Sequence, residues 1–410
     1  MDLAGSQPHT PDGRSPRGAP QEKTLPWRPL APETALAFAR AEGDALDEIR
    51  AAARVLRDQG KSRTITYSRK AFFPVTNLCR DRCAYCTFRR DEGEDGAWTM
   101  TPDEIRAWSE RARGLDCVEA LLCLGDKPED VALGYRRFLS ERGHASTIEY
   151  VAEASRIALD VGLLPHSNPG VMLAADLALL KTCNASLGLM LETTSQRLRK
   201  KGHAHYYAPD KEPAVRLEVL EQAGRQSIPF TTGLLIGIGE TPEERVETLL
   251  AIADVSSRWG SIQEVIVQNF RAKPEIPMAT SDDPSAEDLA RTVALARLLL
   301  GPDANIQIPP NLSPDGLQYL LESGINDFGG ISPLTPDYVN PEAPWPHIAA
   351  LSRQCARSGY QLAERPPIYP EFARRPGFVH PDMEAAVLRA TAEIEERNRT
   401  ALASEEDTER

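Results

Sequence analysis

The chain has 410 residues and a formal net charge of −13. This acidic balance argues against a broad electrostatic footprint for nucleic acid or for an anionic membrane, and it favours a small-molecule substrate. The sequence has no run of about 18 apolar residues and no basic-then-apolar leader, so we expect a cytoplasmic protein with neither a membrane nor a nucleic-acid partner. Seven cysteines, four of them scattered, fit a reducing compartment better than a disulfide framework.

The two ends of the chain differ in composition from its middle. Residues 1–27 are rich in Pro, Gly and charge, and we expect a disordered leader. Within an N-terminal helical segment, 28–64, the Ala-rich stretch 32–57 has apolar spacing near three and four and predicts two short helices. After the main domain, 65–358, we expect a C-terminal extension over 359–396 and a flexible polar tail over 397–410.

Between these ends, short apolar or β-branched runs alternate with amphipathic helical runs. Two helices have start signals, with Thr101 and Thr241 at the N-cap, Pro next and Glu three residues on. Eight βα units imply a parallel sheet closed into a TIM-type (βα)8 barrel, and a six-unit partial barrel with extra elements is the alternative. The predicted strands are 69–76, 117–124, 163–168, 186–192, 229–236, 262–270, 305–310 and 325–331.

Three cysteines follow the first predicted strand: Cys79, Cys83 and Cys86, with three and two residues between them. Thiolates select soft metals and iron–sulfur clusters, and a closed site needs a fourth ligand nearby, which this stretch lacks. The spacing therefore predicts a 4Fe–4S cluster with one iron that the protein does not ligate. A radical S-adenosylmethionine (SAM) enzyme needs such an iron. The alternatives are a structural metal site or reduced surface thiols.

In a barrel of this type the active site lies at the carboxyl ends of the strands. Asp126 and Glu192 end the second and fourth predicted strands. Their carboxylates suit the amine and the ribose hydroxyls of SAM. For each of them a helix cap or an ion pair at the barrel rim is the alternative.

Four other residues are candidates for contacts with SAM. Gly237 and Gly239 allow close approach of the backbone to the adenine. Tyr85 could pack on the adenine or shield the cluster, with an ordinary core position as the alternative. Arg216 could pair with the SAM carboxylate, although a solvated helix arginine is more common.

By these motifs the chain resembles the radical SAM superfamily and, within it, the deazaflavin synthase subunit 1 (CofG-type) family, which makes the Fo chromophore of coenzyme F420. The chain departs from the family pattern in three ways. The superfamily's Gly-Gly-Glu element reads Leu124-Gly125-Asp126, and residues 203–211 contain bulky tyrosines. The chain is also a single unit, whereas some relatives are expected to be fused to a sister subunit. The stretches that carry the resemblance are 74–88, 124–129, 162–170, 190–195, 228–233, 265–274, 308–312 and 328–336.

The resemblance implies a reaction. An external electron donor reduces the cluster, SAM yields a 5'-deoxyadenosyl radical, and the radical takes a hydrogen from a pyrimidine–hydroxybenzyl adduct, 5-amino-5-(4-hydroxybenzyl)-6-(D-ribitylimino)-5,6-dihydrouracil. Ring closure, loss of ammonia and oxidation then give 7,8-didemethyl-8-hydroxy-5-deazariboflavin (Fo). Handover of the unstable adduct suggests transient contact with the tyrosine-coupling sister subunit.

Polar residues at other strand ends supply candidates for substrate contacts and for proton transfer. We expect His166 or Asp327 to move the proton needed for cyclisation or ammonia release. The candidates for hydrogen bonds to the substrate are Asn168, Asn269, Asn311 and Asp327, and Arg271 either joins them or holds a rim carboxylate.

Two other functions would use the same cysteines. Another radical SAM barrel enzyme, of the menaquinone or biotin type, would share the cluster and the SAM contacts but act on a different substrate. A non-catalytic Fe–S protein would use the thiolates alone. Such a protein would not need polar residues at all eight strand ends.

Overall fold

The structure, a computed structural model, describes residues 27–408. Nearly all of the expected leader, residues 1–26, lies outside this range. Eight parallel strands form a barrel that closes because β1 pairs with both β2 and β8. The closed (βα)8 barrel is thereby confirmed over the partial one. The strands are β1 (Thr64–Thr76), β2 (Glu119–Leu124), β3 (Leu164–Asn168), β4 (Ser186–Gly188), β5 (Phe230–Ile236), β6 (Ile262–Asn269), β7 (Ile306–Gln307) and β8 (Asp327–Ile331).

The first strand is longer than its apolar core predicted. Its first residues, Thr64 to Tyr67, pair in parallel with a ninth strand, β9 (Gln361–Glu364), which the sequence did not predict. Its last residues, from Lys70 on, pair with β2 on the same edge. The chain after the barrel therefore returns to the amino-terminal end of β1, which we call the floor of the barrel.

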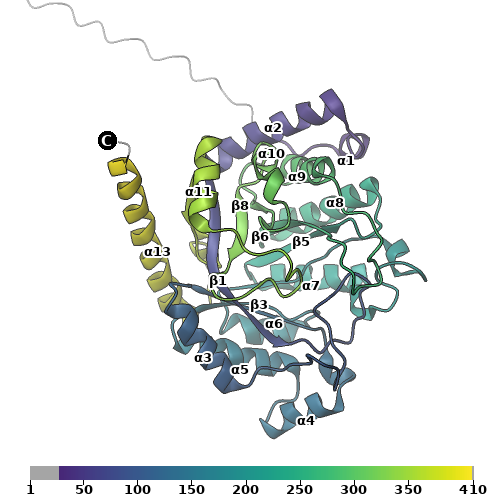
Figure 1. The fold of residues 1–410 in the computed structure, drawn as a ribbon, viewed down its shortest axis with the longest axis vertical. Coiled ribbons are helices and arrows are strands. Elements are labelled where there is room, and N and C mark those ends of the chain that lie inside the picture. The colour runs from purple at the N-terminus through teal and green to yellow at the C-terminus, as the bar shows by residue number, and fades with distance from the viewer. Residues whose placement is uncertain (1–26, 409–410) are drawn as a thin grey trace, which may run out of the picture.

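Helices surround the barrel (Figure 1). Both expected start signals are confirmed: Thr101 and Thr241 form capping boxes with Glu104 and Glu244. The helices around the barrel are α3 (Pro102–Arg113), α4 (Leu133–Glu141), α5 (Thr147–Asp160), α6 (Ala174–Lys181), α7 (Pro213–Arg225), α8 (Pro242–Trp259), α9 (Ala286–Leu300), α10 (Leu317–Leu321) and α11 (Ile348–Arg357).

Two N-terminal helices, α1 (Pro32–Ala37) and α2 (Gly43–Lys61), cover α8 and α9, as Figure 1 shows. A fully buried arginine in each of two helices, Arg57 in α2 and Arg297 in α9, joins that helix to the floor. Arg57 donates to the Tyr360 hydroxyl and to Ile325 O, and Arg297 donates to Gly324 O at 3.0 Å. Arg57 also pairs with the partly exposed carboxylate of Asp58 at 2.6 Å. Among the described residues, the hydrogen bonds of Arg297 go to backbone carbonyls and to the Asn326 side-chain oxygen. Buried charges need such acceptors because water does not reach them.

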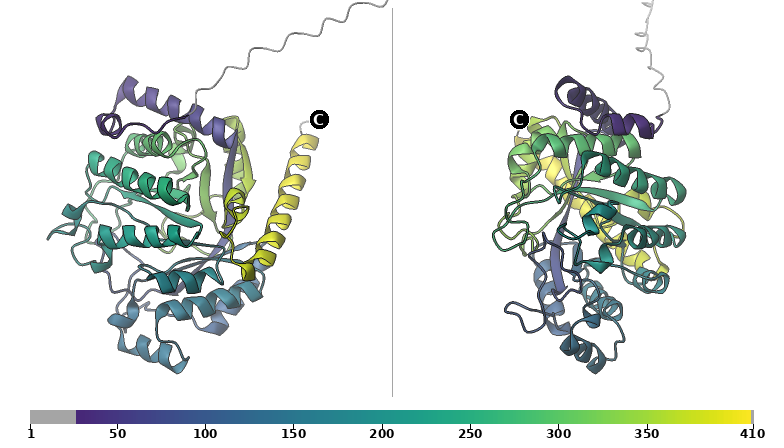
Figure 2. Two further views of the ribbon diagram at one scale, coloured as in Figure 1. Left: turned by 180° about the vertical axis from the view of Figure 1, so that it is seen from behind. Right: turned by 90° about the vertical axis from the view of Figure 1, so that its right-hand side faces the viewer.

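The C-terminal extension contains a short helix, α12 (Pro370–Ala373), and a long helix, α13 (Pro381–Thr408). Figure 2 shows α13 running along one side of the barrel. We expected a flexible tail over 397–410, but α13 continues to Thr408, and Arg397 forms an ion pair with Glu364 of β9 at 2.6 Å. Residues 409–410 lie outside the described residues. None of the helices within residues 27–408 is long and apolar enough to cross a membrane.

Candidate functional site

The three cysteines lie in the loop after β1, and residues 203–211, which we call the strap, hold this loop. Arg82 N donates to Tyr207 O and Ala84 N to Ala204 O, both at 2.9 Å. The Asp81 carboxylate accepts from the backbone N of a strap residue at 3.0 Å. The tyrosine-rich segment that departs from the family pattern thus supports the cysteine loop.

The end of β2 approaches the cysteine loop closely because Gly125 has no side chain. A Cβ added there would lie 2.0 Å from Leu78 O and 2.5 Å from the Cβ of Cys79. This approach lets Asp126 N donate to the Cys79 sulfur at 3.2 Å. A backbone donor aimed at a thiolate is a contact that stabilises a cluster ligand.

The three thiols line one cavity of about 280 Å³. Among the described residues, the one group of three potential metal ligands whose atoms lie within 4.8 Å of one another is Asp81, Asp126 and Asp210, and it includes none of these sulfurs. A single tetrahedral ion would draw its sulfurs to about 3.8 Å from each other. The three sulfurs are therefore not all gathered around one tetrahedral ion, and three thiolates are a donor set that an iron–sulfur cluster uses.

Burial raises the pKa of the Cys79 thiol to about 12, and burial likewise raises the pKa of Cys83. Buried thiols of this kind ionise when a metal supplies the compensating charge. These two thiols are therefore poor free nucleophiles, and binding a metal would be what ionises them.

Asp126 lies beside this loop and lines the same cavity. Its Oδ2 accepts from Val171 N at 3.0 Å, whereas its Oδ1 is buried without a hydrogen-bond partner. Burial, with the nearby charge of Asp210, raises the pKa of Asp126 to about 7. A cation in the cavity would supply the missing partner for Oδ1, and an ammonium group fits this need.

Glu192 also lines the cavity, but its oxygens already have partners. Lys211 Nζ donates to Oε1 at 2.6 Å, His205 Nε2 lies 3.2 Å from Oε2, and the Tyr85 hydroxyl donates to the same oxygen. Although burial alone would raise it, Lys211, His205 and Arg216 hold the pKa of Glu192 well below its usual range. The sequence analysis missed Lys211 and His205, which lie in the strap it had marked only as unusual.

The backbone at Glu192 has a φ of 63°, in the left-handed region that residues other than glycine rarely adopt. Neighbouring contacts fix this conformation, because Glu192 N donates to Gly233 O at 2.8 Å and Leu235 N donates to Glu192 O at 3.1 Å. Strain of this kind persists where surrounding structure enforces it, often at a functional site.

Three other SAM candidates have different outcomes. Arg216 is buried and lines the cavity, and its guanidinium donates to Met190 O at 2.9 and 2.6 Å, so it is not a solvated helix residue. Gly237 and Gly239 do not line the cavity. They form a tight turn that Glu240 caps by accepting from Gly237 N at 2.7 Å. Their approach to the adenine of SAM stays a prediction.

The substrate candidates also divide. Asn168, Asn269 and Arg271 line the cavity, and the Asn269 side-chain oxygen is buried without a partner. Asn311 does not line the cavity, and its amide donates to Asp337 Oδ2 at 3.0 Å.

The cavity continues into an open groove. The groove measures about 1370 Å³ and is also lined by Cys83 and Cys86. Lys273, which the sequence analysis did not single out, lines both spaces and is buried. Burial lowers the pKa of its ammonium group. Together the two spaces form a continuous site at the carboxyl end of the barrel.

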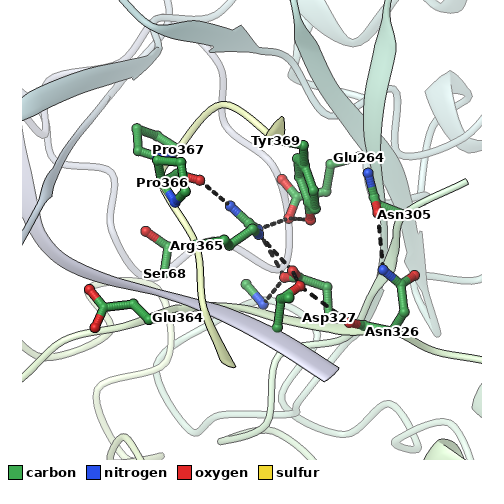
Figure 3. Close-up of polar contacts among 12 residues, drawn as sticks. Ser68, Glu264, Asn305, Asn326, Asp327, Glu364, Arg365, Pro366, Pro367 and Tyr369 are labelled. Carbon is green, nitrogen blue, oxygen red and sulfur yellow. Dashed lines mark hydrogen bonds and ion pairs between the residues drawn. The ribbon is translucent and has the colours of Figure 1, made fainter. Parts of the chain in front are cut away.

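Asp327 does not lie at the mouth of the barrel, where we expected it to transfer a proton. Figure 3 shows it bound to Arg365. It is the first residue of β8, not one near its end, and it is fully buried in the floor. Arg365, which follows β9, donates to both of its oxygens, at 2.6 and 2.9 Å, and to Glu264 at 2.7 Å. The expectation that Asp327 moves a proton for the substrate therefore does not carry over to the structure, because its oxygens are occupied and it does not line the cavity.

His166 lies between the floor and the cavity. It is buried and does not itself line the cavity. Its Nδ1 lies 2.6 Å from Ser186 Oγ. Burial lowers its pKa to about 4, so the ring is neutral at pH 7. His166 therefore cannot touch a ligand in the cavity directly, but its neighbour Asn168 can.

Comparison with known proteins agrees with this site. Residues 73–252 match the model of the radical SAM superfamily. The chain is 48% identical over 326 residues to the 7,8-didemethyl-8-hydroxy-5-deazariboflavin synthase of Methanopyrus kandleri, which covers 79% of this chain and 97% of that protein. It is 48% identical over 347 residues to the FO synthase of Streptomyces avermitilis, covering 82% of this chain and 40% of that protein.

The chain thus spans about two fifths of the length of the FO synthases that it matches. Among solved structures, the [FeFe]-hydrogenase maturase HydG superposes with a TM-score of 0.68 at 18% identity, covering 82% of this chain and 73% of that one. Methylornithine synthase (PylB) superposes with a TM-score of 0.64 at 20% identity, covering 82% and 95%. These two likenesses support the barrel fold. By its sequence, the chain belongs to the radical SAM superfamily and, within it, to the 7,8-didemethyl-8-hydroxy-5-deazariboflavin synthase family.

Proposed function

We propose that this protein makes 7,8-didemethyl-8-hydroxy-5-deazariboflavin from the pyrimidine–hydroxybenzyl adduct, with loss of ammonia, as a step toward coenzyme F420. The name of the Methanopyrus kandleri relative, matched over nearly its whole length, supports the product. The observation that carries the proposal is the site itself. Three thiols with no fourth cysteine or histidine among the described lining residues face a buried carboxylate oxygen that lacks a partner.

Members of the radical SAM superfamily use a 4Fe–4S cluster and SAM. Cys79, Cys83 and Cys86 would hold the cluster and leave one iron for SAM. When bound, the pair supplies a 5'-deoxyadenosyl radical that can take a hydrogen from the substrate. Asp126 Oδ1 would accept from the SAM amine.

The substrate would occupy the part of the site away from the cysteines. Asn168 and Asn269 offer amide groups there, and the partnerless Asn269 oxygen would accept an N–H or O–H of the pyrimidine or ribityl chain. Arg271, whose side chain is 45% exposed, lies at the rim, where a flexible cation can contact a ribityl hydroxyl. The protein's contribution is to hold the substrate in place and to exclude water.

Two partners belong to this proposal. An external electron donor would reduce the cluster, and a tyrosine-coupling sister subunit would hand over the adduct by transient contact. The wide groove beside Cys83 and Cys86 provides a path by which a substrate of this size could enter.

The test is anaerobic reconstitution with iron and sulfide, followed by reductant, SAM and the adduct, with mass spectrometry for 5'-deoxyadenosine and for the deazaflavin. Both products are expected. Asp126→Asn keeps the shape but loses the charge, so it should weaken SAM binding, whereas Asp315→Asn, at an exposed position, should not. Formation of 5'-deoxyadenosine without the deazaflavin would refute the proposed substrate while leaving the radical SAM chemistry intact.

A further inference from the structure

Lys273 is a buried cation that lacks an anionic partner among the residues that the structure describes. It follows β6 and lines both the cavity and the groove, although only 5% of its surface is exposed. Its ammonium group donates to Asn340 Oδ1 at 2.7 Å, and no described carboxylate forms an ion pair with it. Burial lowers the pKa of this ammonium group more than the surrounding acidic groups raise it.

The contact with Asn340 fixes the position of the ammonium group. Asn340 N donates to Asp337 Oδ1 at 3.0 Å, and the Asn340 amide donates to Asp337 Oδ2 at 3.1 Å. These two contacts turn the amide oxygen toward Lys273. An ammonium group has three hydrogens to donate, so two of them remain for a ligand in the site.

The other four cations that line the cavity are already engaged. Arg216 donates to the backbone oxygens of Met190 and Asp210. The remaining three form ion pairs: Arg89 with Asp91, Lys211 with Glu192 and Arg271 with Asp283. A charge that is buried without a partner is costly, so Lys273 is the cation whose partner the ligand would supply.

Aromatic side chains line the same junction of the cavity and the groove. Phe88 lines both spaces, and Tyr338 lines the groove with its ring centre 6.4 Å from that of Phe88. Trp98 adds a third ring to the groove. Aromatic rings pack favourably on one another in tilted or offset arrangements. Apolar walls with one unpaired ammonium group fit a ligand that carries a single polar oxygen on an aromatic ring.

We infer that Lys273 binds the phenol oxygen of the hydroxybenzyl adduct, and that the aromatic ring of the adduct packs against Phe88 and Tyr338. This inference rests on the proposed function, which names the adduct. The phenol is the one hydroxyl of the adduct with an ordinary pKa of about 10, as in tyrosine, so it is the hydroxyl that most readily takes negative charge. The pyrimidine and the ribityl chain remain for Asn168 and Asn269.

Lys273 is thereby a specificity-determining residue. A site built to hydrogen-bond a ligand hydroxyl rejects the analogue that lacks it, because the buried donor is then left unpaired. The contact selects an adduct made from tyrosine over the corresponding adduct made from phenylalanine.

The test compares the deazaflavin product with its analogue that lacks the 8-hydroxyl group, because this stable product keeps the phenol oxygen of the adduct. Binding to the holoprotein, with the cluster oxidised, is measured by fluorescence anisotropy of the deazaflavin ring. Wild-type protein should bind the hydroxylated form about 10- to 100-fold more tightly. Lys273→Met, which has a similar length and no charge, should bind both forms with equal affinity, and retention of the wild-type preference would overturn the inference.

Lys200→Met is the control, because Lys200 is exposed and lines neither space, and it should keep the wild-type preference. Lys273→Gln is a second variant that keeps a donor for Asn340 without the charge, and it should also lose most of the preference. Each variant should keep the iron content and the circular dichroism of the wild-type protein, which checks that the cluster and the fold are intact.

Other partners for the ammonium group would give different results. If Lys273 held the SAM carboxylate, Lys273→Met would weaken SAM binding and keep the preference for the hydroxyl. If Lys273 balanced the charge of the cluster, this variant would shift the reduction potential of the cluster and keep that preference. Either result would overturn the inference.

The proposed function and the inference fail in distinguishable ways. If wild-type protein binds neither deazaflavin and forms none from the adduct, the proposed function fails and the inference fails with it. If deazaflavin forms but Lys273→Met keeps the preference for the hydroxyl, the inference alone fails.

Discussion

Arg365→Met is expected to destabilise the barrel from its floor. The guanidinium of Arg365 is about 95% buried and donates to two carboxylates, those of Asp327 and Glu264, and to Pro366 O. It also lies 4.0 Å from the centre of the Tyr369 ring. Methionine keeps much of the volume but removes every one of these contacts.

The magnitude follows from what remains after the change. Figure 3 shows Arg365 between the carboxylates of Asp327 and Glu264. Without the guanidinium these two carboxylates would be left buried together, and Asp327 has no exposed surface at all. Removing one partner of a buried ion pair costs about 3–5 kcal/mol, because the remaining charge is not compensated. We expect a loss in the free energy of unfolding within this range, reduced to its lower end if Glu264 takes up a proton.

The assay is urea unfolding followed by circular dichroism at pH 7, with Arg399→Met as the control. Arg399 also pairs with a glutamate, but its side chain is 70% exposed, so its loss should cost less than about 1 kcal/mol. A loss below about 1 kcal/mol in Arg365→Met, equal to that of the control, would refute the idea that this ion-pair network holds the floor.

The same geometry makes a prediction for activity. Asp327→Asn should lower stability, yet per folded protein it should still form 5'-deoxyadenosine at about the wild-type rate, because Asp327 does not line the cavity. A thousandfold loss with an unchanged fold would place Asp327 in the chemistry after all.

Three further outcomes are expected. Gly125→Ala should displace the cysteine loop and lower the iron bound after reconstitution, since its Cβ would lie 2.0 Å from a backbone oxygen, whereas Gly316→Ala, with open space around it, should bind iron normally. Cys86→Ser should lose the visible absorbance of the cluster and most of the iron, measured by colorimetric assay; retention of a full cluster would argue against this ligand set. His166 has a folded pKa of about 4, lowered by burial from 6.5, so the unfolded chain binds more protons between these values. Stability should therefore fall by up to about 3 kcal/mol as pH drops from 6.5 to 4, and His166→Gln should remove this part of the pH dependence of urea unfolding; an unchanged pH profile would contradict it.

Local patterns in the sequence determined much of this protein. The alternation of short apolar runs and amphipathic helices located all eight barrel strands, because buried parallel strands and the helices that cover them have distinct periodicities. The capping boxes at Thr101 and Thr241 were likewise readable, since both partners lie within one helical turn. The spacing of the three cysteines indicated a cluster site, since all three lie within one loop.

Tertiary structure decided which polar residues meet. Asp327 lies in the floor because it is the first residue of β8, whereas the sequence analysis counted it among the polar residues at the carboxyl ends of the strands. An error of a few residues in a strand boundary moves a side chain from the mouth of the barrel to its floor. Lys211 and His205 became partners of Glu192 because the strap folds back over the cysteine loop, and no local pattern encodes that return. Arg365 reaches Asp327 only because β9 pairs with the start of β1. Short-range periodicity specifies elements, whereas contacts between distant residues depend on how the chain closes, and those contacts set the charge and hydrogen bonding of the site.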